Sequence, residues 1–531
     1  DEVSRGNVVT FPDENINTSI VCIRNNTGEL VGLCGGRDYD GKRMFNYAYD
    51  NRVNPGSTSK GIFTYPMAFE NVPLATNHYI FDEPIYFKWS RTRVGEEHGY
   101  VGDVSTQRAF TTSYNVVAVK LFRWVEETCG MDVLADYLKS IDIDKNVVDG
   151  INEQYAIGMQ NFRVSPVQLC GAESVILSHG RYIKPHTIRR IEFINSDREP
   201  IEASYEGKQV LSEGAAWLTR YLQEVSVNAN GNADDWLVNG RLQFIKHKDY
   251  TVYGKTGTGL YDKNIIKKYK WPDNATKDYL MIGGTNDYSF AFWIGYDTGQ
   301  YMDKTTYISN SLKMTRIDGK LVNGLLDTLA KTFGKPVTNN PRPDEVTTIR
   351  HIKGIYPYLK SGAISAPSAT SYILKKHVNG ATYTSKFSYK VPTKLENLKT
   401  FTASYDADSK KLTMNWSTYP NPEQTRTGRS VRITFDGKTY TLSKKFDTSI
   451  ITGVVQYCAT ITNNSTGETQ TVAGSKNSTS IKLTNNSDSA VTFTITGFYA
   501  WSKKDLKSNV ITVTVTVPPQ QTQPVDPPEE P

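Results

Sequence analysis

Residues 54–63 have the sequence NPGSTSKGIF, and this stretch decides both the local fold and the chemistry. Pro55 and Gly56 turn the chain into a helix that begins at about residue 57. Because Ser57 and Lys60 are then one helical turn apart, the lysine amine can lie beside the serine hydroxyl. That hydroxyl becomes a nucleophile only when a base takes its proton, and an amine is such a base only when burial or a nearby cation lowers its pKa. Taken alone, the pattern more often marks a helix-capping serine and a solvated lysine.

Two further motifs follow along the chain. The segment SYN at residues 113–115 is weak evidence by itself, because S-x-N also occurs at 226–228 and 475–477. The segment KTGT at residues 255–258 contains the single K-T-G of the sequence, just as Ser57 opens its single S-x-x-K. Lys255 is a candidate for the second cation, and the N–H groups at the start of the serine helix can stabilise an oxyanion.

The three motifs together resemble the S-x-x-K, S-x-N and K-T-G elements of the penicillin-binding protein transpeptidases. The similarity covers most of residues 15–335. It includes an opening hairpin with the sequence IRNNTGELVGLCGGRDYD (23–40), and the segment YGKTGTG (253–259) followed by FAFWIGYD (290–297). The spacing of the motifs suits the bifunctional, class A branch. The resemblance implies an α+β fold, the penicillin-recognising serine transpeptidase fold, in which helices flank an antiparallel sheet.

At the first two motifs, the resemblance assigns a role to each matching residue. Ser57 would be the acyl-accepting nucleophile, and Lys60 would be its general base. Ser113 would relay a proton toward the leaving amine. Asn115 would hydrogen-bond the amide of the substrate and help to hold Lys60.

At the third motif, Lys255 would supply positive potential. Thr256, Gly257 and Thr258 would bind the substrate, with the two threonines holding the terminal carboxylate of a D-Ala-D-Ala donor. The backbone N–H groups of Ser57 and Thr258 would form the oxyanion hole. An acyl transfer needs a nucleophile, a base, an oxyanion site and a carboxylate anchor, and the three motifs supply candidates for all four.

Two residues depart from the family pattern. Gly61 follows Lys60 where the class A branch often has proline, and Gly259 ends a run that the family often ends with threonine or serine. Neither change removes a side chain that the resemblance places in the chemistry. Gly259 is expected to alter the fit of the substrate or of a β-lactam.

The sequence predicts four regions. Residues 1–340 mix helices, expected at 58–70, 115–139 and 165–180, with strands, and form the transpeptidase domain. Two of its hairpins are expected at the turns NNTG (25–28) and TND (285–287). An irregular segment packed on that domain is expected at 341–394. Residues 395–517 predict an all-β sandwich that resembles a fibronectin type III or immunoglobulin-like module with a buried Trp416. The Pro-rich, acidic residues 518–531 predict an extended, disordered tail.

Composition excludes several classes of function. The 531 residues carry a net charge of only +6 without a Lys/Arg-rich block, so nucleic-acid binding is not expected. The seven histidines and five cysteines show no metal-ligand spacing, so neither a metal nor a cofactor is expected. A Cys129–Cys170 bridge is possible, but buried unpaired thiols are favoured. No uncharged apolar run is long enough to span a bilayer.

We therefore interpret the sequence as a serine-type D,D-transpeptidase that cross-links peptidoglycan stem peptides, with a D-Ala-D-Ala donor and an amine acceptor, and that β-lactam antibiotics acylate and inhibit. A D,D-carboxypeptidase, a β-lactamase, and a non-catalytic wall-binding or β-lactam-sensing protein remain alternatives. In the class A branch a membrane helix and a glycosyltransferase domain precede the transpeptidase. The chain is thus expected to be a soluble portion of a protein anchored at the extracytoplasmic face of the bacterial membrane, with cell-wall synthesis proteins as partners.

Overall fold

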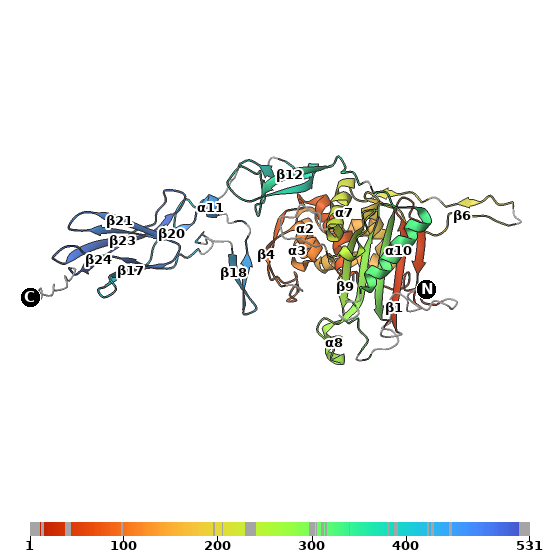
Figure 1. Cartoon of the computed structure of the whole chain (residues 1–531), viewed down its shortest axis with the longest axis horizontal. Helices are drawn as coiled ribbons and strands as arrows, with labels where there is room; N and C mark the ends of the chain where they lie inside the picture. Colours follow the sequence, from red (N-terminus) through yellow and green to blue (C-terminus); the bar gives the residue numbers. More distant parts are fainter. Residues whose placement is uncertain are drawn as a thin grey trace, which may run out of the picture. The chain divides into compact units, whose positions relative to one another are not determined.

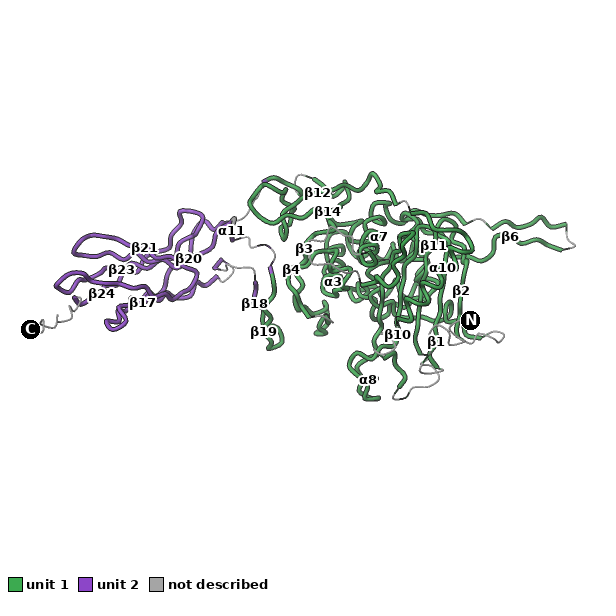
Figure 2. Tube along the Cα trace, viewed as in Figure 1, with its two compact units in different colours: residues 1–385, 432–443 green, residues 386–431, 444–531 purple. Residues whose placement is uncertain are grey.

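The computed structural model divides the chain into two compact units (Figure 2). Unit 1 comprises residues 1–385 and 432–443, and unit 2 comprises residues 386–431 and 444–531. Residues 432–443, which we expected within the C-terminal sandwich, are therefore grouped with the first unit. The structure describes residues 11, 15–37, 44–96, 99–194, 197–203, 205–228, 241–296, 303, 305–309, 313, 316–338, 340–379, 382–386, 391–421, 424–425, 430–444, 446 and 449–519.

A five-stranded antiparallel sheet forms the centre of unit 1, with the strand order β2–β1–β11–β10–β9 (Figure 1). β1 (Ile16–Arg24) and β2 (Leu30–Cys34) form the hairpin predicted around the NNTG turn. β10 (Thr276–Gly284) and β11 (Tyr288–Tyr296) form the second predicted hairpin. β9 (Tyr253–Leu260), which carries the K-T-G motif, is an edge strand. The predicted α+β class is confirmed.

Two buried helices cover this sheet. α6 (Pro166–Leu177) packs on β1 and β11, and nearly all of its residues are buried, so it shows little amphipathic pattern. Ser165 caps α6, and its side chain and that of Gln168 satisfy each other's backbone N–H groups, as the predicted helix start requires. α7 (Glu213–Asn228) packs against α6 and β9.

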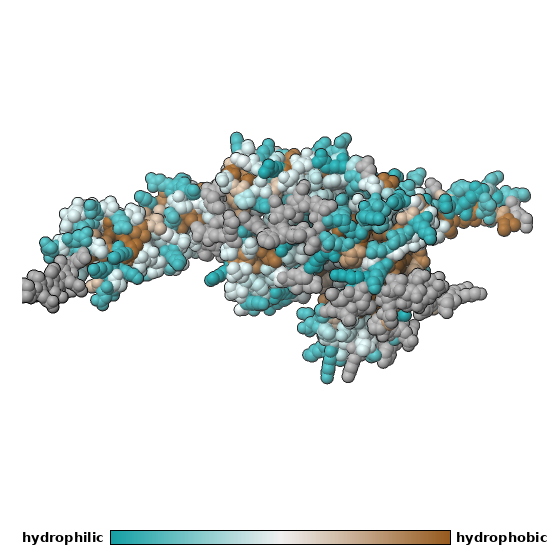
Figure 3. All heavy atoms as spheres, in the orientation of Figure 1, coloured by the Kyte–Doolittle hydropathy of each residue, from teal (hydrophilic) through white to brown (hydrophobic). Residues whose placement is uncertain are grey.

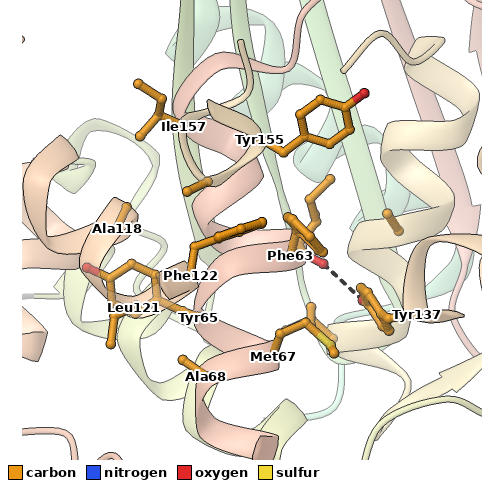
Figure 4. Close-up of a cluster of buried hydrophobic side chains, with 14 of the residues drawn as sticks. Phe63, Tyr65, Met67, Ala68, Ala118, Leu121, Phe122, Tyr137, Tyr155 and Ile157 are labelled. Atoms are coloured by element: carbon orange, nitrogen blue, oxygen red, sulfur yellow. Dashed lines mark hydrogen bonds between the residues drawn. The ribbon is translucent and has the colours of Figure 1, made fainter. Parts of the chain in front are cut away.

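An aromatic cluster holds the helix that contains the S-x-x-K motif (Figure 4). The ring of Phe63 stacks on Tyr137 at a centroid distance of 6.3 Å and meets Phe122 edge-on at 6.1 Å. The Tyr137 hydroxyl donates a hydrogen bond of 2.9 Å to the Ile62 carbonyl. Such residues fill the core, while hydrophilic side chains cover much of the face that Figure 3 shows.

The helix predicted over residues 115–139 is two helices. α3 (Asn115–Cys129) ends at Gly130, and α4 (Asp132–Ser140) follows it. Gly130 has a φ of 87°, a backbone conformation that L side chains rarely adopt. The apolar periodicity continues across this break, which is why the pattern alone suggested one helix.

The segment expected to be irregular contains regular structure. β12 (Val346–Ile352) and β14 (Ser368–Leu374) pair antiparallel, and β13 (Tyr358–Leu359) pairs parallel with β15 (Tyr383–Thr384). The expectation of an irregular segment was therefore wrong for these stretches. The Thr76 amide donates a hydrogen bond of 3.0 Å to the Tyr372 carbonyl of β14, so the segment packs on the helical part of unit 1.

Unit 2 is the predicted all-β sandwich. Its two sheets share one apolar core, in which Trp416 is buried and donates from Nε1 to the Cys458 carbonyl at 2.9 Å. The likeness to a fibronectin type III or immunoglobulin-like module stays a prediction, and most of the predicted tail lies outside the described residues. The strands are β16 (Phe401–Asp406), β17 (Lys411–Trp416), β22 (Ser478–Lys482), β21 (Thr469–Gly474), β20 (Val455–Asn463), β23 (Val491–Trp501) and β24 (Ile511–Val517).

The remaining elements are mostly short; the exception is α10 (Ile317–Phe333), whose Val322 and Leu326 join Phe290 of β11 in one apolar cluster, so this helix also packs on the central sheet. The short elements include β3 (Tyr79–Asp82), β4 (Gly102–Ser105), α2 (Thr106–Thr112), α5 (Lys145–Asp149), η3 (Glu153–Ile157), β5 (Arg181–Tyr182), β6 (Arg190–Ile191), β7 (Ile201–Glu202), β8 (Lys208–Gln209), η4 (Gln243–Ile245), α8 (Lys263–Tyr269), η5 (Lys375–His377) and α11 (Ser449–Thr452).

Candidate active site

The S-x-x-K segment is an unusual helix. A 3₁₀ turn, η1 (Gly56–Thr58), leads into a π-helical stretch, η2 (Lys60–Thr64), and then into α1 (Tyr65–Asn71). π-helical turns are rare and often occur at functional sites. Lys60 is wholly buried, Ser57 is half-buried, and Lys60 Nζ lies 3.0 Å from Ser57 Oγ. The predicted placement of amine and hydroxyl on one face is thus what the structure has.

The S-x-N segment reaches the same amine from the junction of two helices. Ser113 ends α2 in a left-handed conformation, with a φ of 68°, and Asn115 begins α3. Lys60 Nζ lies 2.6 Å from Asn115 Oδ1, 2.7 Å from the Ser113 carbonyl and 3.1 Å from Ser113 Oγ. With Ser57, four oxygens surround a group that has at most three N–H bonds. Of these four, only the two hydroxyls can donate back to the amine when it is neutral.

The third motif brings a second lysine. Lys255, on β9, is 2% exposed, and its Nζ donates to Ser113 Oγ at 2.9 Å and to the Thr256 carbonyl at 3.0 Å. Burial first, and then the positive charges of Lys60 and Arg241, hold the pKa of Lys255 well below its usual value. Ser113 Oγ therefore lies between two amines and is placed to pass a proton.

Glycines allow the K-T-G strand to approach the nucleophile. A Cβ on Gly257 would lie 2.5 Å from the Pro55 carbonyl, and one on Gly56, whose φ is +53°, would lie 2.6 Å from the Thr258 carbonyl. Side chains at these positions would force the strand and the 3₁₀ turn apart. Thr258 is exposed and Thr256 is partly exposed on this edge strand, so both can meet a ligand.

Gly95 and Glu96 also contact the site, although no motif of the sequence places them there. Asn115 Nδ2 donates to the Gly95 carbonyl at 2.7 Å, and the Val116 amide donates to Glu96 Oε1 at 2.5 Å. Burial raises the pKa of Glu96 to about 7. The contact joins a loop to the first turn of α3, and no local motif marks such a pairing. Glu97 lies outside the described residues.

The described residues contain no cluster of His, Cys, Asp or Glu that could hold a metal ion. All five cysteines have free thiols, so the possible Cys129–Cys170 bridge is not formed. Cys22, Cys170 and Cys458 are buried as expected, whereas Cys34 and Cys129 are exposed. Across the same described parts of the chain, no helix is both long and apolar enough to cross a bilayer.

The antiparallel sheet, its covering helices and the fold's likeness to known proteins define the penicillin-recognising transpeptidase fold. A family model described as "Penicillin binding protein transpeptidase domain" matches residues 18–311. The crystal structure of penicillin-binding protein 1A from Haemophilus influenzae aligns with a TM-score of 0.51 at 18% identity, over 68% of this chain and 53% of that one. The chain belongs to the penicillin-binding protein transpeptidase family.

Two curated relatives from Bacillus subtilis are similar in sequence. Penicillin-binding protein 1A/1B is 27% identical over 424 residues, which cover 78% of this chain and 43% of that protein. Penicillin-binding protein 1F is 29% identical over 369 residues, which cover 68% of this chain and 46% of that protein. The chain thus spans less than half the length of these relatives.

Proposed function

We propose that the chain is a serine D,D-transpeptidase that cross-links peptidoglycan stem peptides. The observation that supports this most strongly is the convergence of Ser57, Lys60, Ser113, Asn115 and Lys255 in one hydrogen-bonded cluster. The family match covers the segment that carries all five residues. Each group has a chemical task in acyl transfer.

In the first half-reaction, Lys60 Nζ takes the proton of Ser57 Oγ, which attacks the carbonyl of the penultimate D-Ala. The Oγ–C bond forms, and the oxyanion is held by the backbone N–H groups of Ser57 and Thr258. The C–N bond to the last D-Ala then breaks, and Ser113 passes a proton to the leaving amine. Once Lys60 has taken the proton, its positive charge lies in a buried, low-dielectric setting and acts strongly on the negative charge that develops on the substrate.

In the second half-reaction, the amine of a neighbouring stem peptide attacks the acyl-enzyme carbonyl. The C–N bond forms, the bond from the carbonyl carbon to Ser57 Oγ breaks, and a proton from the amine returns to Ser57 Oγ through Lys60. Among the described strands β9 pairs only with β10, and an extended peptide donor could add to its other edge, beside the nucleophile, by main-chain hydrogen bonds. Thr256 and Thr258 would hold its terminal carboxylate, near the positive potential of Lys255. A D,D-carboxypeptidase would use the same groups with water as the acceptor.

A β-lactam would acylate Ser57 by opening its ring, and the adduct would persist. A β-lactamase must instead activate a water for rapid deacylation, usually with a carboxylate as the base. We further propose that the protein acts at the extracytoplasmic face of the bacterial membrane, anchored through a segment outside this chain and alongside other cell-wall synthesis proteins.

Product analysis tests the assignment. The chain is incubated with a stem peptide that ends in D-Ala-D-Ala, with and without an added amine acceptor, and products are identified by mass. We expect release of one D-Ala and transfer of the acyl group to the amine, both lost in Ser57→Ala. Hydrolysis alone, whatever the acceptor concentration, would assign a carboxypeptidase. No product and no β-lactam labelling would favour a non-catalytic binding protein.

A further inference from the structure

A β-hairpin from the C-terminal part of the chain pairs beside strand β4 (Gly102–Ser105). That strand is followed at once by α2, and the C-terminal end of α2 carries Ser113 of the active site. β18 (Ser430–Phe435) and β19 (Lys438–Ser443) are joined by Asp436 and Gly437, which both have positive φ, as a two-residue hairpin turn requires. The sheet order is β18–β19–β4–β3, and Ser443 pairs with Gly102 of β4. The residues on either side of 432–443 belong to unit 2, whereas this segment belongs to unit 1.

One face of the hairpin supplies two rings to the loop before β4. The ring of Phe435 lies 4.5 Å from that of Tyr86, and the ring of Tyr440 lies 5.5 Å from that of Tyr100. The guanidinium of Arg93 lies 5.0 Å from the Tyr100 ring, 5.8 Å from the Phe435 ring and 5.6 Å from the Tyr440 ring. A guanidinium among three aromatic rings is favourable at each contact.

The same loop continues into the hydrogen bonds that hold the S-x-N segment. Arg93 Nε donates to the Tyr100 hydroxyl at 2.7 Å, and that hydroxyl donates to the Val94 carbonyl at 2.8 Å. The next residue, Gly95, accepts the 2.7 Å hydrogen bond from Asn115 Nδ2. Asn115 Oδ1 in turn accepts from Lys60 Nζ. An unbroken series of contacts therefore runs from the hairpin to the catalytic amine.

A second route runs through the backbone. β4 (Gly102–Ser105) leads directly into α2, and α2 ends at Ser113. A Cβ on Gly102, whose φ is +79°, would lie 2.1 Å from the Ser443 carbonyl, so the hairpin approaches β4 as closely as two backbones can. The strand and the loop on the two sides of residue 101 are thus both in contact with residues 432–443.

We infer that the hairpin of residues 432–443 is a positioning element of the active site, which holds Asn115 and Ser113 in register with Lys60 through residues 86–95, Tyr100 and β4. The inference rests on the proposed acyl transfer. Its residues touch neither the substrate nor the reacting atoms. Their effect is on the alignment of the groups that do, and a misplacement of about 1 Å in such groups can cost about 10²-fold in rate.

The test compares two faces of the hairpin. Phe435→Ala/Tyr440→Ala removes the rings that face the loop. Thr434→Ala/Thr439→Ala is the matched control, because these exposed hydroxyls contact each other at 3.2 Å on the other face. Tyr440→Phe keeps the ring and is the conservative rescue. Arg93→Ala breaks the contact from the loop side and leaves the hairpin sequence intact.

Two quantities are measured on the full chain: the rate constant of acylation by a fluorescent penicillin, and the rate of amide hydrogen exchange. We expect the double ring variant and Arg93→Ala to lower the acylation rate constant by about 10- to 100-fold, with little change in the non-covalent dissociation constant. Amide exchange at Asn115 and Val116 should rise in the same variants. The threonine control and Tyr440→Phe should match the parent on both measures.

A ring variant whose acylation rate constant stays within about twofold of the parent overturns the inference, even if exchange rises. Equal losses in the ring and threonine variants also overturn it, because the effect would then not depend on the rings. If the parent chain is not acylated at all, the proposed function fails. The exchange at Asn115 and Val116 then decides whether the hairpin positions this segment.

Discussion

The active-site region of unit 1 and the core of unit 2 are both buried. The buried groups of the first are mainly polar, whereas those of the second are mainly apolar. At the active site two amines, Lys60 and Lys255, are 0% and 2% exposed and surrounded by hydroxyl, amide and carbonyl oxygens. In unit 2, Trp416 and its neighbours form an apolar core whose polar contacts are made by ring substituents, such as the indole hydrogen bonds of Trp416 to the Cys458 carbonyl and of Trp501 to the Thr452 carbonyl. Burial of charge costs free energy, whereas burial of apolar area supplies it. The first region is therefore arranged for chemistry, and the second for stability.

The largest expected effect separates the two regions by activity. Lys60→Met removes the proposed base, and the rate constant for acylation by penicillin should fall by about 10²–10⁴. The control is Lys145→Met, because the Lys145 side chain is 87% exposed. Stopped-flow labelling measures both variants. A Lys60→Met chain that labels at the parent's rate would remove the amine from the mechanism.

The converse change acts on unit 2. Trp416→Ala should lower the free energy of unfolding of unit 2 by about 3–5 kcal/mol, because removal of the large ring leaves a cavity and the indole hydrogen bond to the Cys458 carbonyl is lost. Calorimetry should show the unfolding transition of unit 2 at a lower temperature than in the parent. Below that temperature, the acylation rate should stay within about twofold of that of the parent. Loss of acylation while unit 2 is still folded would contradict this separation.

A smaller effect is a pH dependence of the stability of unit 1, caused by a buried carboxyl group. The described core of unit 2 contains no buried carboxyl group. Glu173 on α6 is wholly buried, and its Oε2 accepts a hydrogen bond from Gln223 Nε2 at 3.1 Å. Burial raises its pKa from 4.5 to about 8. The folded state therefore binds this proton more tightly than the unfolded state, so its contribution to the stability of unit 1 is full below about pH 4.5 and is lost as pH rises to about 8.

Glu173→Gln should remove this part of the pH dependence. Urea unfolding of unit 1 at pH 5 and at pH 8 should show a smaller difference in the variant than in the parent. Glu213→Gln is the control, since the side chain of Glu213 is 49% exposed. If Glu173 made the parent more stable at pH 8 than at pH 5, relative to Glu173→Gln, the pH dependence would have the opposite sign, and the raised pKa of Glu173 would be disproved.

The smallest effect is at Gly61, one of the two departures from the family pattern. A Cβ there would lie 3.2 Å from Gln223 Nε2 and 3.3 Å from Ile282 Cδ1, which are the ends of flexible side chains. The tight contact opposes the gain of about 0.5–1 kcal/mol that alanine has over glycine in a helix. We expect Gly61→Ala to change the unfolding free energy by less than about 1 kcal/mol and to leave acylation intact. Thermal unfolding and penicillin labelling test both parts.

Local patterns were enough to predict the elements that carry the motifs. The NNTG and TND turns predicted two hairpins of the central sheet, and Pro166 predicted the first turn of α6. The meeting of Ser57, Ser113 and Lys255 could be expected only through the family resemblance, because no periodicity places residues this far apart in one cluster. The structure supplies that proximity.

Other features depend on packing that a linear pattern does not contain. Apolar periodicity runs through Gly130, so the break between α3 and α4 was missed. The strands of residues 346–384 are short and follow the Pro- and Asn-rich stretch NNPRPDE (339–345), so the sequence suggested an irregular segment. The contact of Glu96 with the Val116 amide, and the return of residues 432–443 to unit 1, both join segments with no shared motif.

The most direct test of the central claim is the intact mass of the protein after brief exposure to penicillin. We expect one covalent adduct per chain that is stable over the time of the measurement. The adduct should lie on the peptide that contains Ser57 and should be absent from Ser57→Ala. An unmodified mass at saturating penicillin, or an adduct that forms equally in Ser57→Ala, would contradict it.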